Sequence, residues 1–481
     1  MFSRDSILTQ KFWPGLVIFW LLAGLSCVPK PQPAPPASFM MRAEPLIAER
    51  RYGEAVAVLE EVARAYPVNP LPLLKIGQIY AVQQRWLLAE DAFNRALARE
   101  PQNALALAGL AETLYGQGRL DEAVTFWQKA AAVNPHLPGV FTGLGRTYLA
   151  KFEFEAAKKA FLEQQHQQPD PEALWFLAAL EAPTDVSAAR DYLQSIASPQ
   201  ESGLAERRDY LLAALKPFTA ESAKAEAAKA TGIALAQAQL WPLAIHALTL
   251  AREEQGQSVD AETLAFLGYA QVQADRPALE LFRQAQQADP NSAWPLYFQG
   301  LYLRQKGTLR AAEAAFKQAV TLDPQNAAFY VEMAETKAQR GDLASAELWY
   351  EAAVQVSEQD LQFKLLQAKF FANWGYRIAE AGIPAARAIT QADKDNAEAY
   401  DLLGWMQFLT GAPESGEAAL RQALTLNPDL TSARYHLARQ LEALGQKTEA
   451  AEEYQRVIDW DTSGDFRDRA LKDLQRLDTP H

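Results

Sequence analysis

The sequence predicts an all-α fold built from repeated helix pairs. The stretch from Leu73 to Pro101 carries apolar and small residues at helical spacing in two runs separated by a short turn, which indicates two amphipathic helices. Prolines recur at intervals of 34 residues, at Pro101, Pro135 and Pro169 and again at Pro290 and Pro324. A helix pair with one apolar face needs neighbours that cover it. A recurring pair therefore predicts a solenoid.

Two positions of the repeat remain small in every clear copy. Counted from Pro70 as position 1, position 8 carries Gly77, Ala111, Gly145, Gly300, Ala334, Gly404 and Ala438. Position 20 carries Ala89, Ala123, Ala157, Ala312, Ala346, Gly416 and Ala450. Helices packed at about 8 to 10 Å need a small residue where their backbones come nearest. These positions therefore predict the contact between the two helices of a pair.

Larger residues and helix ends complete the repeat. Position 24 carries Phe93, Trp127, Phe161, Phe316, Tyr350, Leu420 and Tyr454. The proline at position 32 ends the second helix, because it lacks an amide hydrogen and its predecessor disfavours the helical region. Asn103 and Asn326 follow at position 34, where we expect each to cap the next helix.

In this pattern the sequence resembles the tetratricopeptide repeat family, whose pattern W-x2-L-G-x2-Y, A-x3-F and P is matched in order and in residue size. Seven clear copies begin near residues 70, 104, 138, 293, 327, 397 and 431. Another copy, degenerate at its front, precedes Pro67 with Ala55 and Leu59 in register. The resemblance implies an all-α, right-handed superhelical solenoid of about 11–12 helix-turn-helix repeats that binds other proteins.

Composition and charge narrow the classes of function. Hydrophobic residues make up 49% and aromatic residues 10% of the 481 residues, which is enough to bury a core. The formal net charge of −13 disfavours nucleic acid as a partner, because binding to phosphates relies on Lys and Arg. The length alone would suggest about three globular domains, but a solenoid grows by adding repeats.

The first 27 residues have the pattern of a signal or membrane anchor. Arg4 and Lys11 precede an apolar run that ends at Cys27, the one cysteine in the sequence. This placement resembles the lipobox of bacterial lipoproteins, which implies cleavage before Cys27 and lipidation of its thiol. The alternative is an uncleaved signal anchor, because the 18 residues from Phe12 to Pro29 carry no charge.

Either form of the N-terminus predicts a protein tied to a membrane. The repeats would lie on the extracytoplasmic face if the basic flank stays inside. Residues 28–38, VPKPQPAPPAS, form a proline-rich linker that cannot be helical and that separates the repeats from the anchor.

The remaining sequence divides into four parts. Residues 39–171 form an N-terminal block of regular repeats, 172–258 divergent helical repeats, 259–464 a C-terminal block, and 465–481 a capping helix and tail. Within 172–258, a full copy begins near Ala225 with Gly232 at its position 8; a flexible joint is the alternative for this segment. The copy at 259 lacks two residues before Pro290, and the copy at 361 has two extra before Asn396. We expect these changes in turns or as distortions of one helix.

No catalytic constellation stands out. The sequence has no glycine-rich phosphate loop and no nucleophile elbow, and acidic pairs such as Glu60 and Glu61 fit solvated helix faces. The five histidines do not have metal-ligand spacing: His136, His166, His246, His436 and His481. We therefore predict a protein that is not an enzyme, with no cofactor, no metal and no small-molecule substrate.

The resemblance implies a binding surface on the first helix of each repeat, chiefly at positions 2, 5, 9 and 12. In the C-terminal block it implies partner contacts at Trp294, Tyr297, Arg304, Trp405, Phe408, Tyr435 and Arg439. Aromatic side chains bury large areas at little entropic cost, so we expect the aromatic members to anchor an extended or helical segment of a partner. The alternative is that they pack against neighbouring repeats.

One activity of the family is not expected. Its chaperone-binding members hold a terminal carboxylate with Lys, Asn and Arg, whereas this sequence has Leu74, Gln78, Ala108 and Glu112 at the relevant positions. The sequence therefore predicts a membrane-anchored scaffold or adaptor that works through protein contacts in the assembly of an envelope complex. Two alternatives are an accessory subunit that presents substrate to a separate enzyme and a membrane adaptor that faces the cytoplasm.

Overall fold

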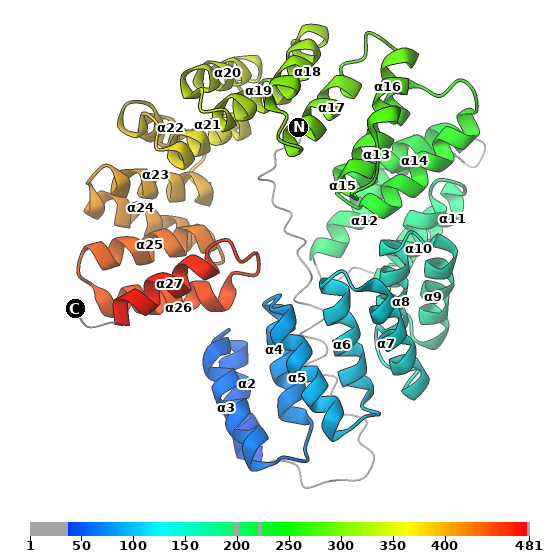
Figure 1. Ribbon diagram of the computed structural model, residues 1–481, viewed down its shortest axis with the longest axis vertical. Coiled ribbons are helices and arrows are strands. Elements are labelled where there is room, and N and C mark those ends of the chain that lie inside the picture. The colour runs from blue at the N-terminus through cyan, green and yellow to red at the C-terminus, as the bar shows by residue number, and fades with distance from the viewer. Residues whose placement is uncertain (1–36, 197–201, 220–223, 479–481) are drawn as a thin grey trace. The chain divides into compact units, whose positions relative to one another are not determined.

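The computed structural model describes residues 37–196, 202–219 and 224–478 (Figure 1). Within these ranges the chain forms 26 α-helices, one π-helical turn and no strand. The predicted all-α solenoid of helix pairs is confirmed. Cys27, the predicted signal and residues 28–36 of the proline-rich linker lie outside the described residues. The last two linker residues, Ala37 and Ser38, were predicted to be non-helical, but they begin the first described helix. Among the helices of the described ranges, none combines the length and apolar character that crossing a membrane requires.

The chain divides into two compact units, with the boundary between Tyr302 and Leu303 inside α17 (Trp294–Gln305). We call the part before this boundary, chiefly residues 54–302, the N-terminal unit. The part that follows, with which Ala48–Gly53 are grouped, is the C-terminal unit. The boundary lies outside the segment 172–258, in which the sequence raised a joint as an alternative.

Helices of the N-terminal unit follow one another in pairs, with α12 as an additional single helix. They are α2 (Ala37–Ala48), α3 (Tyr52–Ala65), α4 (Leu71–Val82), α5 (Trp86–Arg99), α6 (Ala104–Gly116), α7 (Leu120–Val133), α8 (Val140–Ala150), α9 (Phe154–Gln167), α10 (Pro171–Glu181), α11 (Val186–Ser195), α12 (Ser202–Leu215), α13 (Lys224–Gln237), α14 (Trp241–Gln255), α15 (Ala261–Gln273) and α16 (Leu279–Ala288).

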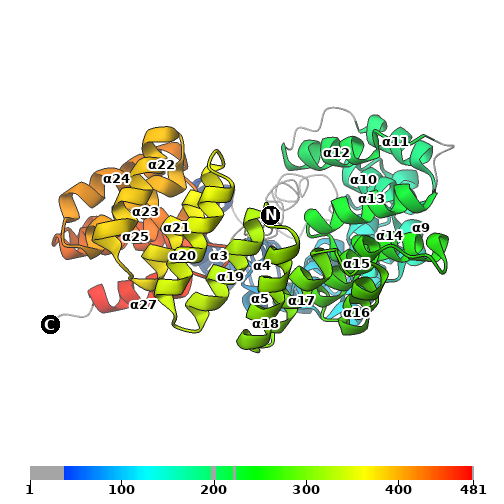
Figure 2. The same ribbon diagram turned by 90° about the horizontal axis from the view of Figure 1, so that it is seen from above.

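The C-terminal unit continues the same alternation and ends in a single helix. After the end of α17 come α18 (Leu309–Leu322), α19 (Ala327–Gln339), α20 (Leu343–Val356), α21 (Leu361–Trp374), η1 (Ile378–Gly382), α22 (Ile383–Ala392), α23 (Ala397–Leu409), α24 (Pro413–Leu426), α25 (Thr431–Ala443), α26 (Lys447–Trp460) and α27 (Arg467–Asp478). Helices α23, α24 and α25 pack on one another, as Figure 2 shows.

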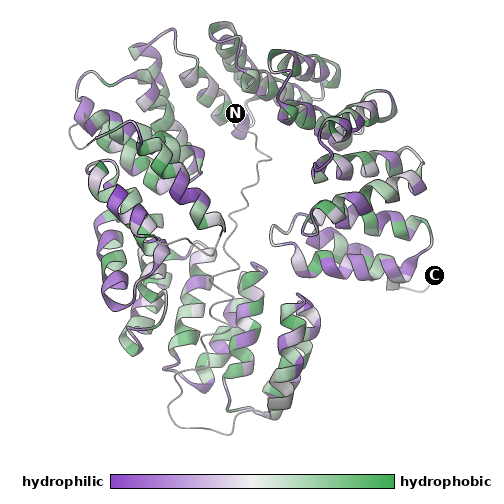
Figure 3. Ribbon diagram, turned by 180° about the vertical axis from the view of Figure 1, so that it is seen from behind, coloured by the Kyte–Doolittle hydropathy of each residue, from purple (hydrophilic) through white to green (hydrophobic). Residues whose placement is uncertain are grey.

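The small residues lie where the two helices of a pair meet. A Cβ atom on Gly77 of α4 would come within 2.7 Å of Cε1 of Phe93 on α5, which is closer than atoms in contact approach. Phe93 itself is buried, so the ring occupies the space that a side chain at position 77 would need. Each helix carries both hydrophobic and hydrophilic residues (Figure 3). The prediction that position 8 stays small because the two helices of a pair come close there is confirmed for this pair.

The predicted caps begin the first helices of two repeats. The Asn103 side chain accepts a hydrogen bond from the amide of Ala106 in α6, and Asn326 accepts one from Ala328 in α19. Each satisfies an amide that has no partner within the helix. First helices of neighbouring pairs also contact one another directly, as α4 contacts α6 and α23 contacts α25. In the C-terminal unit, contacts of this kind join α19, α21, α23 and α25 in turn.

The two changes in repeat length alter second helices. In the copy that lacks two residues, α16 has 10 residues, whereas α18 of the following copy has 14. In the copy with two extra residues, a π-helical turn, η1, precedes α22, after Gly375 and Arg377 in the left-handed region at φ 61° and 46°. A π-helical turn accommodates inserted residues without breaking the helix. The expected distortion is confirmed in both copies.

The divergent segment 172–258 contains a regular pair. A Cβ atom on Gly232 of α13 would come within 2.5 Å of Cγ of Leu248 on α14, as the copy beginning near Ala225 predicts. The imidazole of His246 on α14 also lies 4.2 Å from the ring of Phe154 on α9. Helix α14 therefore contacts the block that precedes the segment.

The final helix closes the apolar core of the C-terminal unit. Both carboxylate oxygens of Asp461 accept hydrogen bonds in the turn before α27, and Oδ2 accepts the amides of Phe466 and Arg467, each at 2.8 Å. Ala470 of α27 is fully buried against α26. The capping helix predicted within residues 465–481 is observed as α27, from Arg467 to Asp478.

Candidate partner-binding surface

A row of aromatic rings runs across the last two repeats of the C-terminal unit. Trp405 on α23 stacks on Phe408 at 5.4 Å and on His436 of α25 at 4.2 Å between ring centroids. Phe466, before α27, meets His436 edge-on at 5.8 Å. All four side chains are partly exposed. We call these four residues the aromatic strip.

Polar groups fix the orientation of His436. Its Nδ1 lies 2.7 Å from Oδ1 of Asp401, and the Ser432 hydroxyl donates to Oδ2 of the same carboxylate at 2.6 Å. Because a carboxylate only accepts, Nδ1 carries the hydrogen of this bond. In the neutral imidazole, Nε2 is then an acceptor, on a side chain that is partly exposed. Asp401 therefore holds the His436 ring in the orientation in which it stacks on Trp405.

Arg439 supplies a positive charge next to the strip. Its side chain is 34% exposed, and Nη1 lies 3.4 Å from the Tyr435 hydroxyl and 3.8 Å from Asp473. Burial lowers the pKa of Arg439, but the contacts with Tyr435 and Asp473 outweigh it and raise the pKa overall. The Tyr435 hydroxyl donates to Asp473 at 2.9 Å, and burial raises its pKa. Both groups therefore keep their protons at neutral pH.

The structure separates the seven residues predicted to touch a partner into two groups. Tyr297 is fully buried, Tyr435 is 5% exposed and Arg304 is 5% exposed. In this structure these three serve packing, which is the alternative that the sequence left open. The other four are partly exposed: Trp294, Trp405, Phe408 and Arg439. Trp405 and Phe408 stack on each other, and Arg439 lies on α25, the helix that carries His436. Trp294 lies in the N-terminal unit against Phe266, with 5.5 Å between the ring centroids.

The burial of Arg304 has a specific cause. Its guanidinium forms an ion pair with Glu332, and the two side chains are 2% and 3% exposed. Burial raises the pKa of Glu332, although the positive charge of Arg304 opposes this. The same guanidinium lies 5.8 Å from the ring centroid of Phe316. Arg304 therefore joins α17, α18 and α19 and does not present its charge to a partner.

Two members of the surface were not predicted. His436 occupies position 6 of its repeat, which is not one of the four expected positions, and Phe466 follows the last repeat. A signal for His436 was present, since it lies four residues after Ser432 and three before Arg439, at spacings that share one helix face. No repeat position points to Phe466, because its place depends on how the chain turns before α27.

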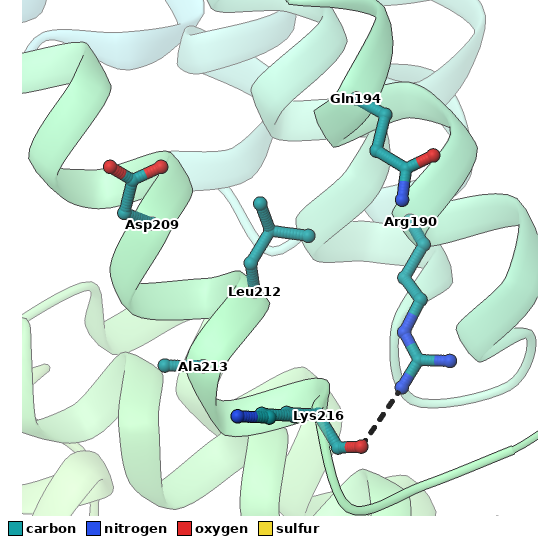
Figure 4. A pocket seen from close by; sticks show the side chains of 6 residues that line it. All are labelled: Arg190, Gln194, Asp209, Leu212, Ala213 and Lys216. Atoms are coloured by element: carbon teal, nitrogen blue, oxygen red, sulfur yellow. Dashed lines mark hydrogen bonds between the residues drawn. The ribbon is translucent and has the colours of Figure 1, made fainter.

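An open groove lies between α11 and α12 in the N-terminal unit (Figure 4). It has a volume of about 580 Å³ and is lined by Arg190, Gln194, Asp209, Leu212, Ala213 and Lys216. The Arg190 guanidinium donates to the carbonyls of Leu215 at 2.5 Å and Phe218 at 2.6 Å. Arg190 therefore provides hydrogen-bond donors and a positive charge to carbonyl groups at the C-terminal end of α12, which stabilises that helix end. Among the described residues, no group of three or more His, Cys, Asp or Glu is placed to hold a metal ion.

Comparison with protein families identifies the repeats. Two family models, each described as tetratricopeptide repeat, match the sequence, one at residues 40–97, 74–138 and 411–465 and the other at 303–370. The chain carries tetratricopeptide repeats. These tetratricopeptide repeats occur in both units, and His436 of the aromatic strip lies within a matched range. No curated protein matches the sequence.

Several solved structures contain chains with similar arrangements of helices. Yeast Tom70 is 12% identical with a TM-score of 0.43, over 92% of this chain and 95% of that chain. Cut9–Hcn1, an APC/C hetero-tetramer, is 14% identical with a TM-score of 0.39, over 92% and 89%. YrrB, described as a TPR protein with an unusual peptide-binding site, is 17% identical with a TM-score of 0.31, over 41% of this chain and 100% of that chain.

Proposed function

We propose that this chain is a protein-interaction scaffold whose aromatic strip holds a segment of a partner protein. The observation that carries the proposal is the grouping of Trp405, Phe408, His436 and Phe466 beside the partly exposed Arg439. Aromatic and arginine side chains dominate the binding energy of protein interfaces. The first helices α19, α21, α23 and α25 contact one another in turn, so an extended or helical segment can follow the face that they form.

Site-directed photo-crosslinking tests this proposal. A benzoylphenylalanine at position 408 is expected to form adducts with a partner protein in intact cells. The same group at position 348 serves as the matched control, because Leu348 is 65% exposed on α20 of the same unit but does not belong to the strip. Adding Trp405→Ala should reduce the adducts from position 408 severalfold. Equal adducts from both positions, unchanged by Trp405→Ala, would refute the proposal.

We further propose that the N-terminus ties the scaffold to a membrane on its extracytoplasmic face. The support is the basic flank, the apolar run and the placement of Cys27 at its end. In this setting the strip would help to assemble an envelope complex. Metabolic lipid labelling of the wild type and of Cys27→Ser tests the lipoprotein form. Labelling of the wild type alone is expected, and equal labelling of both chains would exclude lipidation at Cys27.

A further inference from the structure

A second polar cluster lies in the N-terminal unit, on the first helices of three successive repeats. Arg146 on α8 donates from Nη2 to Oε1 of Glu112 on α6 at 2.9 Å. Its guanidinium also lies 5.2 Å from the ring centroid of Tyr115. The side chains of Arg146 and Glu112 are 13% and 26% exposed. This ion pair borders Glu172, in the first turn of α10.

Glu172 has a buried carboxylate oxygen without a donor. The residue is 7% exposed, and no described group donates a hydrogen bond to its buried Oε2. The neighbouring Asp170 takes the donors available at this helix start, namely the Thr142 hydroxyl and the Glu172 amide. A buried carboxylate that lacks donors is unfavourable, and buried polar atoms in proteins are normally paired. Glu172 is therefore an acceptor that the fold itself does not use.

The charges that face Glu172 come from four elements. Arg146 on α8 and Arg207 on α12 are positive, whereas Glu112 on α6 and Asp170 at the start of α10 are negative. The two positive and two negative charges cancel, so the cluster has a net charge of minus one when Glu172 is ionised. Burial raises the pKa of the Glu172 carboxyl to about 7, with Asp170 and Glu112 adding to this and the two arginines opposing it. Near neutral pH the cluster thus stands between a neutral and an anionic state.

We propose that the cluster of Glu112, Arg146 and Glu172 recognises a cationic side chain, Arg or Lys, of a bound protein segment. The guanidinium or ammonium donates hydrogen bonds to the Glu172 carboxylate, and the proton held by Glu172 passes to solvent as the cation binds. Charge-assisted bonds of this kind are about twice as strong as neutral ones. The inference rests on the N-terminal unit alone, so it stands or falls independently of the aromatic strip.

Titration calorimetry with a defined probe tests this site. The probe is hexa-arginine with an acetylated N-terminus and an amidated C-terminus, so that it does not titrate near neutral pH; hexa-citrulline is the uncharged control. For the wild-type chain we expect the affinity to rise about tenfold between about pH 6 and pH 8, as Glu172 ionises. Glu172→Gln should lower the affinity at about pH 8 roughly tenfold and remove its pH dependence.

A matched variant separates this site from the general acidity of the chain. Glu61→Gln removes the same charge from an exposed position on α3, and we expect it to change the affinity less than about twofold. Titrations at about pH 7 in buffers of different ionisation enthalpy should show release of about half a proton by the wild type and none by Glu172→Gln. Equal losses in the two variants, or no proton release by the wild type, would overturn the proposal. If Glu172→Gln does not fold, proton release by the wild type decides alone.

Discussion

Glu172 makes the stability of the N-terminal unit depend on pH. Burial raises the pKa of its carboxyl from the ordinary value of 4.5 to about 7. Between these values the folded chain holds a proton that the unfolded chain has lost. The stabilisation due to this proton is complete below about pH 4.5 and is lost as the pH rises through about 7. The difference between the two pKa values corresponds to about 3 kcal/mol, at about 1.4 kcal/mol for each pH unit.

Glu172→Gln should remove this dependence, because the amide stays neutral at every pH. Urea unfolding of the purified chains, followed by far-UV circular dichroism, gives the free energy of unfolding at about pH 4.5, 6 and 8. We expect the wild type to lose about 3 kcal/mol relative to Glu172→Gln across this range. Glu61→Gln, at an exposed site, should follow the wild type. A difference between wild type and Glu172→Gln that stays constant with pH would refute the assignment.

Three further substitutions test helix packing and capping by the same unfolding measurement. Gly77→Ala should destabilise the pair α4 and α5 by about 1–3 kcal/mol, because the new methyl group would collide with the Phe93 ring; an unchanged unfolding midpoint would contradict this contact. Arg304→Met should cost about 3–5 kcal/mol, because it leaves the Glu332 carboxylate buried without its partner, and Arg304→Met combined with Glu332→Leu should recover most of the loss. Asp461→Ala should cost about 1 kcal/mol and increase amide exchange in α27, whereas Asp461→Asn should retain part of the cap.

Most of the fold could be predicted from the repeat pattern, because the contacts that define each repeat join residues that are close in the sequence. Gly77 and Phe93 are 16 residues apart and meet within one helix pair, and Asn103 caps the helix that follows it directly. Such contacts recur at a fixed interval, so the sequence displays them many times. The extra residues before Asn396 could likewise be predicted, because they break that interval. Their form as the π-helical turn η1 could not, since a turn or a bulge would accommodate them equally.

The candidate surface was less predictable because it depends on contacts between repeats. A repeat position tells which side of a helix a residue occupies, but not what the next repeat places over it. Tyr297, Asp401 and Tyr435 hold the same position in their repeats, and all three are buried, although the resemblance implied partner contacts at this position. His436 joins the strip only because Asp401 and Trp405 of the preceding repeat receive it. The contacts of His436 with Asp401 and Trp405 could therefore not be predicted from the repeat period alone.

The last helix links the end of the solenoid to the candidate surface. The sequence predicted a capping helix here, and in the structure Asp473 and Ala470 of this helix are turned inward, towards Tyr435 and the core. Asp473 also borders Arg439, while the turn before the helix places Phe466 against His436. A cap that only solvated the final repeat would need none of these contacts. Helix α27 and the turn before it therefore both close the solenoid and position the last residue of the aromatic strip. We expect partner binding at the strip to weaken when the packing of α27 is weakened.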